Sequence, residues 1–329
     1  MVFGQHSIWV WGIFNLFVIL MLVIDLGVFH RRQHAVGIRE ALTWTGVWIA
    51  VAMAFNLLLL FKGQDWHLLA IDREGNPLSQ SRTAVLFLTA YLIEKSLSMD
   101  NIFVFLLIFK FFGIPGQFQH KVLFWGILGA LVMRLAFILG GVALLHHFHW
   151  VAYVFGTILL LTGIKMWRSG DAEVHSDRNP ILRLLRRLMP VQDDLAEGRF
   201  AVKRDGRWFA TPILVSLVVI ETTDVLFAVD SVPAVLSVTT DPLIAYTSNV
   251  FAILGLRALY FALAGIMPLF EDLHYGLSFI LIFVGGKMIA GQLIIFPEWM
   301  HWVSLSVIAA TLGIAILTSV LRHRQQVMS

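Results

Sequence analysis

Five acidic residues lie within stretches of chain that are otherwise strongly apolar, and their side chains are the ones best suited to chemistry. Glu94 and Asp100 fall in one of these stretches, and Glu221, Asp224 and Asp230 fall in another. An aspartate at the centre of a bilayer costs roughly 2.5–3.5 kcal/mol on insertion scales, so a purely structural bundle has no reason to carry so many acids. Their presence predicts a pathway for ions through the membrane.

The spacing of the acids in the second stretch predicts how a helix presents them. Glu221 and Asp224 are three residues apart and share one face, whereas the step of six residues to Asp230 turns about 120° around the axis. Pro233 cannot donate an N–H group and clashes with the carbonyl group of Val229, so we expect a kink or an unwound stretch beside Asp230. Such a break frees backbone carbonyl oxygens as additional ligands.

Neutral oxygen-bearing side chains accompany the acids and complete a donor set without sulfur: Ser98, Asn101, Thr222, Thr223 and Ser231. Oxygen donors suit a hard divalent cation, and magnesium, manganese and calcium all fit them. Zinc and copper fit less well, because the chain has no cysteine and its 12 histidines lie mostly near the ends of the apolar stretches. Two or three carboxylates approach neutrality around a divalent ion and take up protons without it, so we expect cation export coupled to proton entry.

Four basic residues inside or at the ends of apolar stretches need partners of their own. We expect Arg134 and Arg257 to form a gating or structural pair with the acids, which replaces the cation when the site is empty. Lys165 and Lys287 lie nearer to the ends of their stretches, where they either pair with the acids or extend toward the interface. Asp25, near the end of the first apolar stretch, is equally suited to be a further ligand or an interface residue.

The elements that must position these side chains follow from the composition. The 329 residues are 58% hydrophobic and 14% charged, with a mean hydropathy of +0.81, whereas soluble domains are about 45–50% apolar and about 25% charged. These values exclude a water-soluble globule and predict an all-α polytopic membrane protein whose partner is the lipid bilayer, with no nucleic-acid partner. About nine stretches have the spanning length of about 20 residues: residues 8–29, 39–61, 84–111, 121–146, 150–167, 211–237, 243–269, 275–296 and 299–321.

Lysine and arginine gather in alternate loops and predict the orientation. Arg31, Arg32 and Arg39 follow the first apolar stretch, and Arg322 and Arg324 close the chain. Because cytoplasmic loops are enriched in these residues, we expect the N-terminus outside and the C-terminus in the cytoplasm, with the protein in the inner (plasma) membrane. The residues before the first stretch carry no positive charge and no cleavage site follows it, so we expect that helix to be retained.

The chain repeats itself at an interval of about 120 to 130 residues. The landmarks recur in the same order: Glu94 and Asp100 match Asp224 and Asp230, Arg134 matches Arg257, and Thr162–Met166 matches Val284–Met288. Each unit holds three helices, an odd number, so the second unit enters the membrane from the opposite side. Two inverted three-helix repeats are typical of alternating-access transporters, whose site lies at the repeat interface. The competing explanation is chance matching among apolar helices.

This organisation divides the chain into five parts: two peripheral transmembrane helices in 1–83, a first repeat in 84–167, a cytoplasmic loop in 168–210, a second repeat in 211–296, and a final helix with a cytoplasmic tail in 297–329. In the loop, Asn179 is suited to cap an amphipathic helix that begins at Pro180. The segment Phe200–Ala210 alternates around Asp205 and Gly206 as a β-hairpin does. The loop is either a solvated linker or an element that binds partners.

Three segments carry a family resemblance. EKSLSMDNIFVF (94–105), ETTDVLFAVDSVPAV (221–235) and TTDPLIAYTSNVFAILGLRALYF (239–261) closely resemble the signature segments of the TerC family of integral membrane proteins, including its Alx branch. The resemblance implies three-helix inverted repeats, manganese export and an association with tellurium resistance. It also implies that the acids of the metal path are Glu94, Asp100, Glu221, Asp224 and Asp230. Manganese as the ion comes from this resemblance alone, because the donor types indicate only a divalent cation.

Two classes of function are therefore open. The first is a membrane transporter that exports divalent metal ions, with manganese as the transported ion and no tightly bound cofactor. The second is a membrane scaffold or assembly factor in tellurite or envelope stress responses, which uses residues 168–210 to recruit proteins and keeps the acids as a structural ion site. We do not expect an enzyme, because the sequence has no HExxH motif, no GxGD pair and no serine with a matching histidine in an apolar stretch.

Overall fold

The computed structural model describes residues 6–29, 37–72, 75–148, 150–169, 189–192, 194–204, 207–264, 273–294, 297 and 299–328. Within these ranges some side chains lie outside the description, including those of Asp25 and Asp100. The helices are α1 (Ile8–Phe29), α2 (Ile38–Lys62), α3 (Gln80–Phe111), α4 (Gly116–His147), α5 (Val151–Ser169), α7 (Pro212–Val238), α8 (Pro242–Leu254), α9 (Leu256–Ala264), α10 (Leu273–Ala290) and α11 (Met300–Met328). A short turn of 3-10 helix, η2 (Ala196–Gly198), precedes the two strands β1 (Ala201–Arg204) and β2 (Arg207–Ala210).

The fold is that of an all-α membrane protein. In the described part of the chain, six helical segments are long and apolar enough to cross a bilayer: α2, α4, α5, α7, α8 with α9, and α11. Shorter apolar windows lie in α1 and α10. The outward surface of α1 is apolar, with Ile8, Trp9, Ile13 and Leu16 all more than half exposed, as expected of a surface that faces lipid.

Local signals in the sequence explain where several helices begin. Ser79 caps α3 by accepting a hydrogen bond from the backbone N–H of Arg82 at 3.3 Å. Thr211 and Asp241 cap α7 and α8 in the same way, and in both cases a proline follows as the first helical residue. Proline costs the helix no hydrogen bond at that position, because the N–H group that it lacks would have no partner within the helix.

The helix breaks differ from those expected. A kink or an unwound stretch is expected beside Asp230, and of the two the unwound stretch is absent, because α7 continues as a helix through Pro233 to Val238. Residues 231–236 are all buried, so packing on the surrounding helices holds α7 together despite the missing hydrogen bond. The break occurs instead at Gly255, which divides the single helix expected over 243–269 into α8 and α9.

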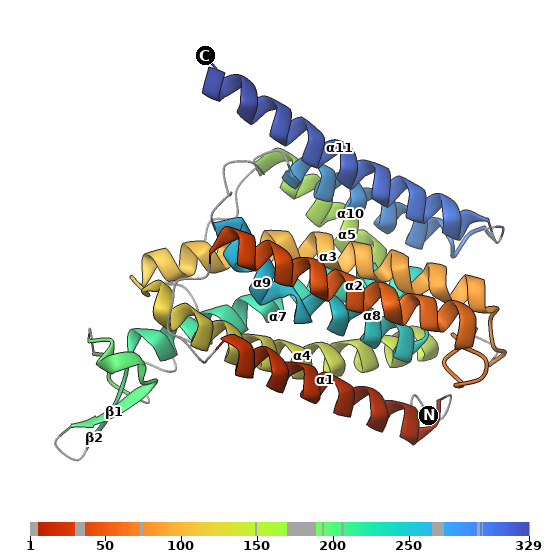
Figure 1. Ribbon diagram of the computed structural model, residues 1–329. Helices are drawn as coiled ribbons and strands as arrows, with labels where there is room; N and C mark the ends of the chain where they lie inside the picture. Colours follow the sequence, from red (N-terminus) through yellow and green to blue (C-terminus); the bar gives the residue numbers. More distant parts are fainter. Residues whose placement is uncertain are drawn as a thin grey trace.

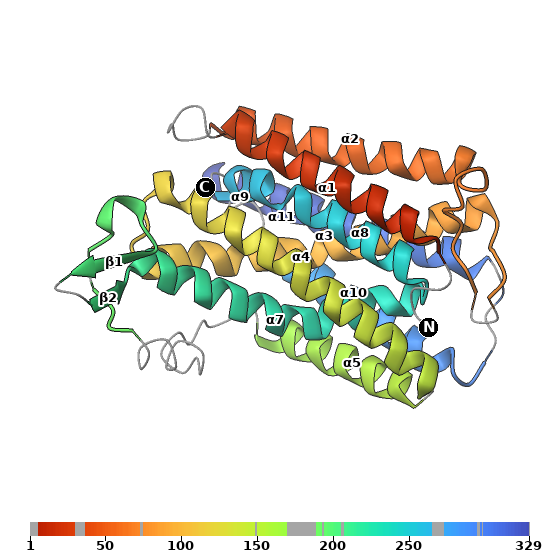
Figure 2. The same ribbon diagram turned by 90° about the horizontal axis from the view of Figure 1, so that it is seen from below.

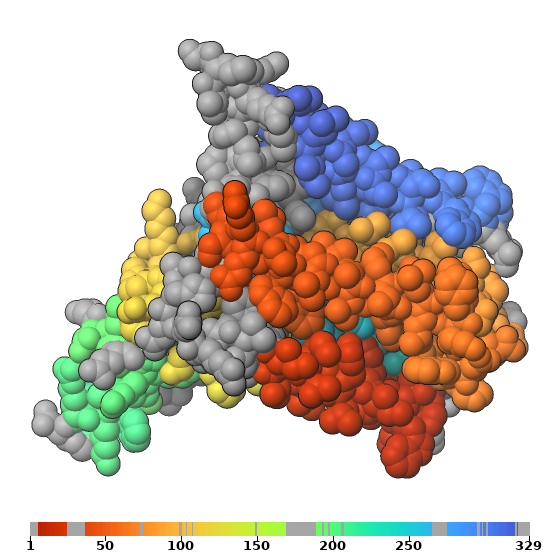
Figure 3. Space-filling model, in the orientation of Figure 1, coloured from red at the N-terminus to blue at the C-terminus, as the bar shows by residue number. Residues whose placement is uncertain are grey.

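The helices pack in pairs that link distant parts of the chain. Figures 1 and 2 show α4 beside α7, α5 beside α10 and α3 beside α8, and these pairs make extensive contacts along their lengths. Helix α3 also packs on α7, which brings the two acid-bearing helices together. Helices α2, α1 and α11 cover one outer face of this group, as the space-filling view in Figure 3 shows.

The predicted hairpin in the long loop is confirmed. Strands β1 and β2 pair antiparallel, with Ala201 opposite Ala210 and Arg204 opposite Arg207. The hairpin projects at one end of the molecule, beside the starts of α4 and α7 (Figure 1). Lys121 of α4 donates a hydrogen bond to the Gly198 carbonyl at 3.0 Å and anchors the loop there. The predicted amphipathic helix that begins at Pro180 lies outside the described residues.

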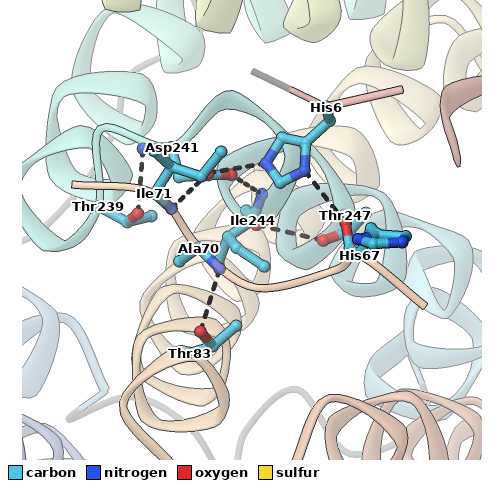
Figure 4. Close-up of polar contacts among 9 residues, drawn as sticks. All are labelled: His6, His67, Ala70, Ile71, Thr83, Thr239, Asp241, Ile244 and Thr247. Atoms are coloured by element: carbon cyan, nitrogen blue, oxygen red, sulfur yellow. Dashed lines mark hydrogen bonds and ion pairs between the residues drawn. The ribbon is translucent and has the colours of Figure 1, made fainter. Parts of the chain in front are cut away.

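A buried network at the opposite end joins the N-terminal segment, the segment between α2 and α3, and the start of α8 (Figure 4). The Asp241 carboxylate accepts hydrogen bonds from His6 Nε2 and from the backbone N–H groups of Ile71 and Ile244, each at 2.9 Å. Close by, the Thr83 hydroxyl of α3 accepts from the N–H group of Ala70, the residue before Ile71. The network therefore places the starts of α3 and α8 side by side, so the two helices run parallel.

Candidate cation site

Arg134 of α4 is the centre of the polar cluster inside the helix bundle. Its side chain is 2% exposed, and its guanidinium group forms an ion pair with the fully buried Glu94 of α3. A second ion pair joins Arg134 Nη2 to Asp224 Oδ1 of α7 at 3.2 Å. Arg134 Nη1 also donates to the Ser231 hydroxyl at 3.4 Å. One arginine thus ties together acids from both predicted repeats.

The cluster has an unbalanced formal charge. One guanidinium group faces the carboxylates of Glu94 and Asp224, so the three groups sum to minus one when both acids are ionised. A single arginine therefore leaves room in the charge balance for a further positive charge. A divalent cation in place of the guanidinium group would bring the two carboxylates to neutrality, which is the arrangement that buried charges require.

Helices α4 and α7 approach closely at the cluster, and glycines permit it. A Cβ atom on Gly126 would lie 3.3 Å from the side chain of Ile220, and one on Gly129 would collide with the Glu221 carboxyl group. The Glu221 carboxyl group, one turn before Asp224, therefore lies against the backbone of α4. Farther along, a Cβ atom on Gly141 would lie 2.6 Å from Leu236. Because the paired residue numbers rise together, α4 and α7 run parallel.

A small cavity adjoins Asp224. Its volume of about 10 Å³ is close to the space that one water molecule needs. Its walls come from α3, α4, α7, α8 and α9, and they include Phe105, Gly126, Ala130, Ile220, Asp224 and Ile253. Five helices thus meet around the Asp224 carboxylate at this cavity.

Asp230 lies apart from this cluster. Its carboxylate accepts a hydrogen bond from the Thr162 hydroxyl of α5 at 2.9 Å. Lys165, one turn farther along α5, is exposed, in line with a position near the end of a span. The six-residue step from Asp224 thus turns Asp230 toward α5, as the helix geometry predicts.

The remaining candidates lie elsewhere in the bundle or outside the described residues. Lys287 of α10 donates to Ser304 of α11 at 2.7 Å, so this lysine has a neutral partner in the peripheral helix. Arg257 is 2% exposed in α9, just after the break at Gly255. Ser98 and Asn101 are buried in α3. The side chains of Asp25 and Asp100 lie outside the described part of the structure.

No three histidine, aspartate or glutamate residues are gathered closely enough to hold a metal ion, among the residues that the structure describes. In this arrangement Arg134 occupies the position between the carboxylates. The acids that it holds, together with the Ser231 hydroxyl, are oxygen donors of the kind that a hard cation prefers.

Lys95 is a buried charged residue that sequence reasoning missed. Its ammonium group donates to the carbonyl oxygen of Ala252 at 3.2 Å and lies against Gly255, at the end of α8. The last carbonyl groups of a helix have no partners within the helix and carry a partial negative charge, so a cation is stabilised there. The available signal was a lysine directly after Glu94 in an apolar stretch, but the sequence does not reveal the break in the facing helix.

Comparison with known proteins identifies relatives along most of the chain. The model of the integral membrane protein TerC family matches residues 79–327. An uncharacterized membrane protein of Myxococcus xanthus is 45% identical over 315 residues, which cover 95% of this chain and 92% of the relative. The Escherichia coli K12 protein named "Putative membrane-bound redox modulator Alx" is 43% identical over 280 residues, which cover 85% of each chain. A membrane protein of Rickettsia felis is 37% identical over 95% of this chain and 97% of the relative. No solved structure matches.

Proposed function

The chain belongs to the TerC family of integral membrane proteins, and on that premise we propose that it is a transporter that exports divalent metal ions, most of all manganese. The cation is the cargo and no tightly bound cofactor is needed. The single observation that carries the proposal is the pairing of one buried arginine, Arg134, with Glu94 and Asp224. One carboxylate is enough to neutralise an arginine in a structural ion pair. Two carboxylates are needed to neutralise a divalent cation that takes the place of the arginine.

The proposed path contains Glu94, Asp100, Glu221, Asp224 and Asp230, with Ser98, Asn101 and Ser231 as neutral oxygens. In this proposal Arg134 releases the carboxylates when the cation enters and returns when it leaves. Arg257 performs the related role for the other repeat. Ion and proton compete for the same carboxylates, so cation export is coupled to proton entry.

Close approaches between α5 and α10 support the two inverted repeats. A Cβ atom on Gly285 would lie 2.8 Å from the carbonyl oxygen of Gly156, and one on Gly163 would lie 2.8 Å from the carbonyl oxygen of Ser278. If each residue of the first repeat corresponds to the residue 122 positions later, Gly156 corresponds to Ser278 and Gly163 to Gly285. The contact between Gly156 and Gly285 therefore corresponds to the contact between Ser278 and Gly163, as expected for two repeats that are related by a twofold axis. The repeat likewise makes α3 correspond to α7 and α4 correspond to α8 with α9. The pair α4 with α7 therefore corresponds to the pair α8 with α3, and the helices of both pairs run parallel.

The proposed orientation puts the N-terminus outside and the C-terminus in the cytoplasm of the inner membrane, with nine transmembrane segments. The hairpin then lies on the cytoplasmic side and the His6–Asp241 network on the outer side. Arg31, Arg32 and, in the first turn of α2, Arg39 lie on the cytoplasmic side in this orientation, in line with the enrichment of arginine on that side of the membrane.

The name of the Escherichia coli relative refers to redox modulation. A redox role of this chain cannot use its own thiol groups, because the sequence contains no cysteine. The second candidate function is the scaffold that recruits proteins through residues 168–210, and the hairpin within that segment is an ordered surface for it.

Metal content in cells separates the two functions. Cells that express the protein and are loaded with manganese should retain less manganese than cells with Asp224→Asn at equal expression. Asp194→Asn is the matched control, because Asp194 is exposed and its carboxylate contacts Arg204 and the N–H group of Ala196 within the loop, far from the buried acids. Equal manganese in cells with the wild type and cells with Asp224→Asn would overturn transport, and loss of a protein partner in the Asp194 control would favour the scaffold.

A further inference from the structure

Asn249 of α8 points into the interior of the helix bundle. It lies one turn before Ile253, which lines the cavity beside Asp224, and one turn after the fully buried Ala245. Residues four apart share a helix face, so the Asn249 side chain lies on the same face as both neighbours. Phe251 turns the other way, with its ring centroid 4.9 Å from that of Phe55 in α2.

Ser98 of α3 lies on the matching face of its own helix. Glu94, one turn before it, pairs with Arg134, and Phe105, two turns after it, lines the cavity. These positions repeat at the spacing of a single helical face. Ser98 therefore lies between the carboxylate of the cluster and the wall of the cavity.

Asn249 and Ser98 lie on either side of the level at which Lys95 of α3 meets Ala252 of α8. The network around Asp241 holds the starts of α3 and α8 together, and the bond from Lys95 to Ala252 ties them again farther along. Phe105 and Ile253 then meet at the cavity. Relative to the bond from Lys95 to Ala252, Asn249 lies one turn earlier on α8 and Ser98 lies one turn later on α3, so the two residues flank the level of Glu94.

Both side chains are buried without hydrogen-bond partners in the described part of the chain. Asn249 is 1% exposed, and neither its amide oxygen nor its amide nitrogen is bonded. Ser98 is 1% exposed, and its hydroxyl group is unbonded, whereas Ser96 on the same helix donates to the carbonyl group of Leu92. The second carboxylate oxygen of Glu94, Oε2, is also unbonded. Buried polar groups are nearly always bonded, so unbonded ones on facing helices indicate a ligand that the helices themselves do not supply.

We infer that Asn249 and Ser98 supply neutral oxygen ligands to the transported divalent cation, from α8 and α3, next to the carboxylates of Glu94 and Asp224. This inference rests on the proposed transport of such a cation. A hard cation takes six or more oxygen ligands, and amide and hydroxyl oxygens complete its shell without adding negative charge. The site then has an acidic side that binds the ion or Arg134, and a neutral side that only the ion uses.

If Asn249 is a ligand, its replacement should change cation binding and thermal stability in different ways. In a purely structural role, Asn249→Leu would lose contacts and lower the thermal midpoint. In a ligand role the asparagine is retained at a cost in stability, so leucine should leave the midpoint unchanged or raise it while it weakens cation binding. The test uses the purified full-length protein in detergent and in proteoliposomes, with manganese chloride as the probe.

For Asn249→Leu and Ser98→Ala we expect the KM for manganese uptake to rise about tenfold. Without manganese, the thermal midpoint should equal or exceed that of the wild type, and the stabilisation that added manganese gives the wild type should shrink. Thr247→Val and Ser96→Ala are the matched controls. Their hydroxyl groups bond to carbonyl groups of their own helices, so their KM should be unchanged.

Asn249→Asp keeps the side-chain oxygen and adds charge, so it should lower the KM even if Asn249→Leu does not fold. An unchanged KM in Asn249→Asp, or in a folded Asn249→Leu, would overturn the inference while leaving transport intact. A wild-type protein that neither moves nor is stabilised by manganese would instead overturn the proposed function.

Discussion

At the scale of single residues, the ion pairs of Arg134 explain why so many charges are tolerated in the bundle. Each acid that the arginine contacts is buried, with Glu94 at 0% and Asp224 at 4% exposure. A lone buried charge is costly, so the arginine and the acids depend on one another. The repeat predicts that acids and arginines meet, but helix periodicity does not show that a single arginine takes acids from both repeats.

Replacing the arginine tests this mutual dependence. Arg134→Met leaves Glu94 and Asp224 buried without their partner, and we expect a loss of about 3–5 kcal/mol of stability. The double variant Arg134→Met with Glu94→Gln removes one of the two carboxylate charges, so it should recover part of the loss. Thermal unfolding of the purified variants in detergent measures both effects. Equal midpoints for the single and the double variant would show that the charges are not coupled.

His6 provides a prediction about pH. Burial lowers the pKa of His6, but the hydrogen bond and the charge of Asp241 outweigh it and, with the His67 carbonyl group, raise the pKa above its ordinary value of 6.5. Both ring nitrogens face acceptors, since Nε2 lies 2.9 Å from Asp241 and Nδ1 lies 3.4 Å from the His67 carbonyl oxygen. Only the protonated imidazolium ring donates from both nitrogens.

A raised histidine pKa means that the folded state binds the proton more tightly than the unfolded state. The stabilisation is therefore complete below the ordinary pKa and is lost as the pH rises through the folded value. The wild type should be more stable than His6→Gln by about 1–3 kcal/mol near pH 6, and the difference should shrink as the pH rises above 6.5 through the raised pKa of the folded state. Thermal midpoints across this range measure it, with His147→Gln as an exposed control at the end of α4. A constant difference at every pH would exclude the ion pair as its cause.

At the scale of elements, close approaches of helix backbones hold the bundle together. Helices α5 and α10 meet at Gly156, Gly163 and Gly285, and α4 meets α7 at glycines as well. Small residues at such contacts let helices pack closely where lipid provides no hydrophobic driving force between them. The apolar periodicity predicts the helices, but it does not identify these neighbours.

Two adjacent glycines give a matched comparison. A Cβ atom at position 285 would lie 2.8–3.0 Å from backbone and side-chain atoms of α5, whereas one on Gly286 meets nothing within 4 Å. Gly285→Ala should therefore lower stability by about 1–3 kcal/mol through overpacking. Gly286→Ala should be neutral or slightly stabilising, because alanine favours the helix. Thermal unfolding distinguishes the two, and equal effects would argue against the packing of α5 on α10 described above.

The sequence predicted the helices of this protein well, except where packing against other helices determines the backbone conformation. The predicted bounds of the first helix, residues 8–29, equal those of α1, and the predicted hairpin in the loop is present. No unwound stretch lies beside Pro233, where residues 231–236 are all buried, and a break that was not expected lies at Gly255. Lys95 and Asn249 were missed for a related reason: their importance comes from α8 facing α3, which no local pattern encodes.

At the scale of the whole molecule, the two ends of the bundle should face opposite sides of the membrane. The segment around Asp65 lies at the end that holds His6, and Lys203 lies on the hairpin at the other end (Figure 1). Both side chains are exposed, and the chain has no cysteine of its own. Single cysteines at these positions are therefore clean reporters of orientation.

In intact cells, a thiol reagent that cannot cross the membrane should label Asp65→Cys and should label Lys203→Cys only after permeabilisation. The wild type, which lacks cysteine, gives the background. Labelling of Lys203→Cys alone in intact cells would reverse the orientation. Equal labelling of both in intact cells would mean that the two ends lie on the same side of the membrane.

The central claim is that a divalent cation and protons exchange at the carboxylates that Arg134 holds. The most direct measurement is manganese flux in proteoliposomes that contain the purified protein and a pH-sensitive dye. We predict manganese movement accompanied by opposite movement of protons, and loss of both in Asp224→Asn but not in Asp194→Asn. Manganese movement no faster than in empty liposomes, or equal in Asp224→Asn and the wild type, would contradict the account.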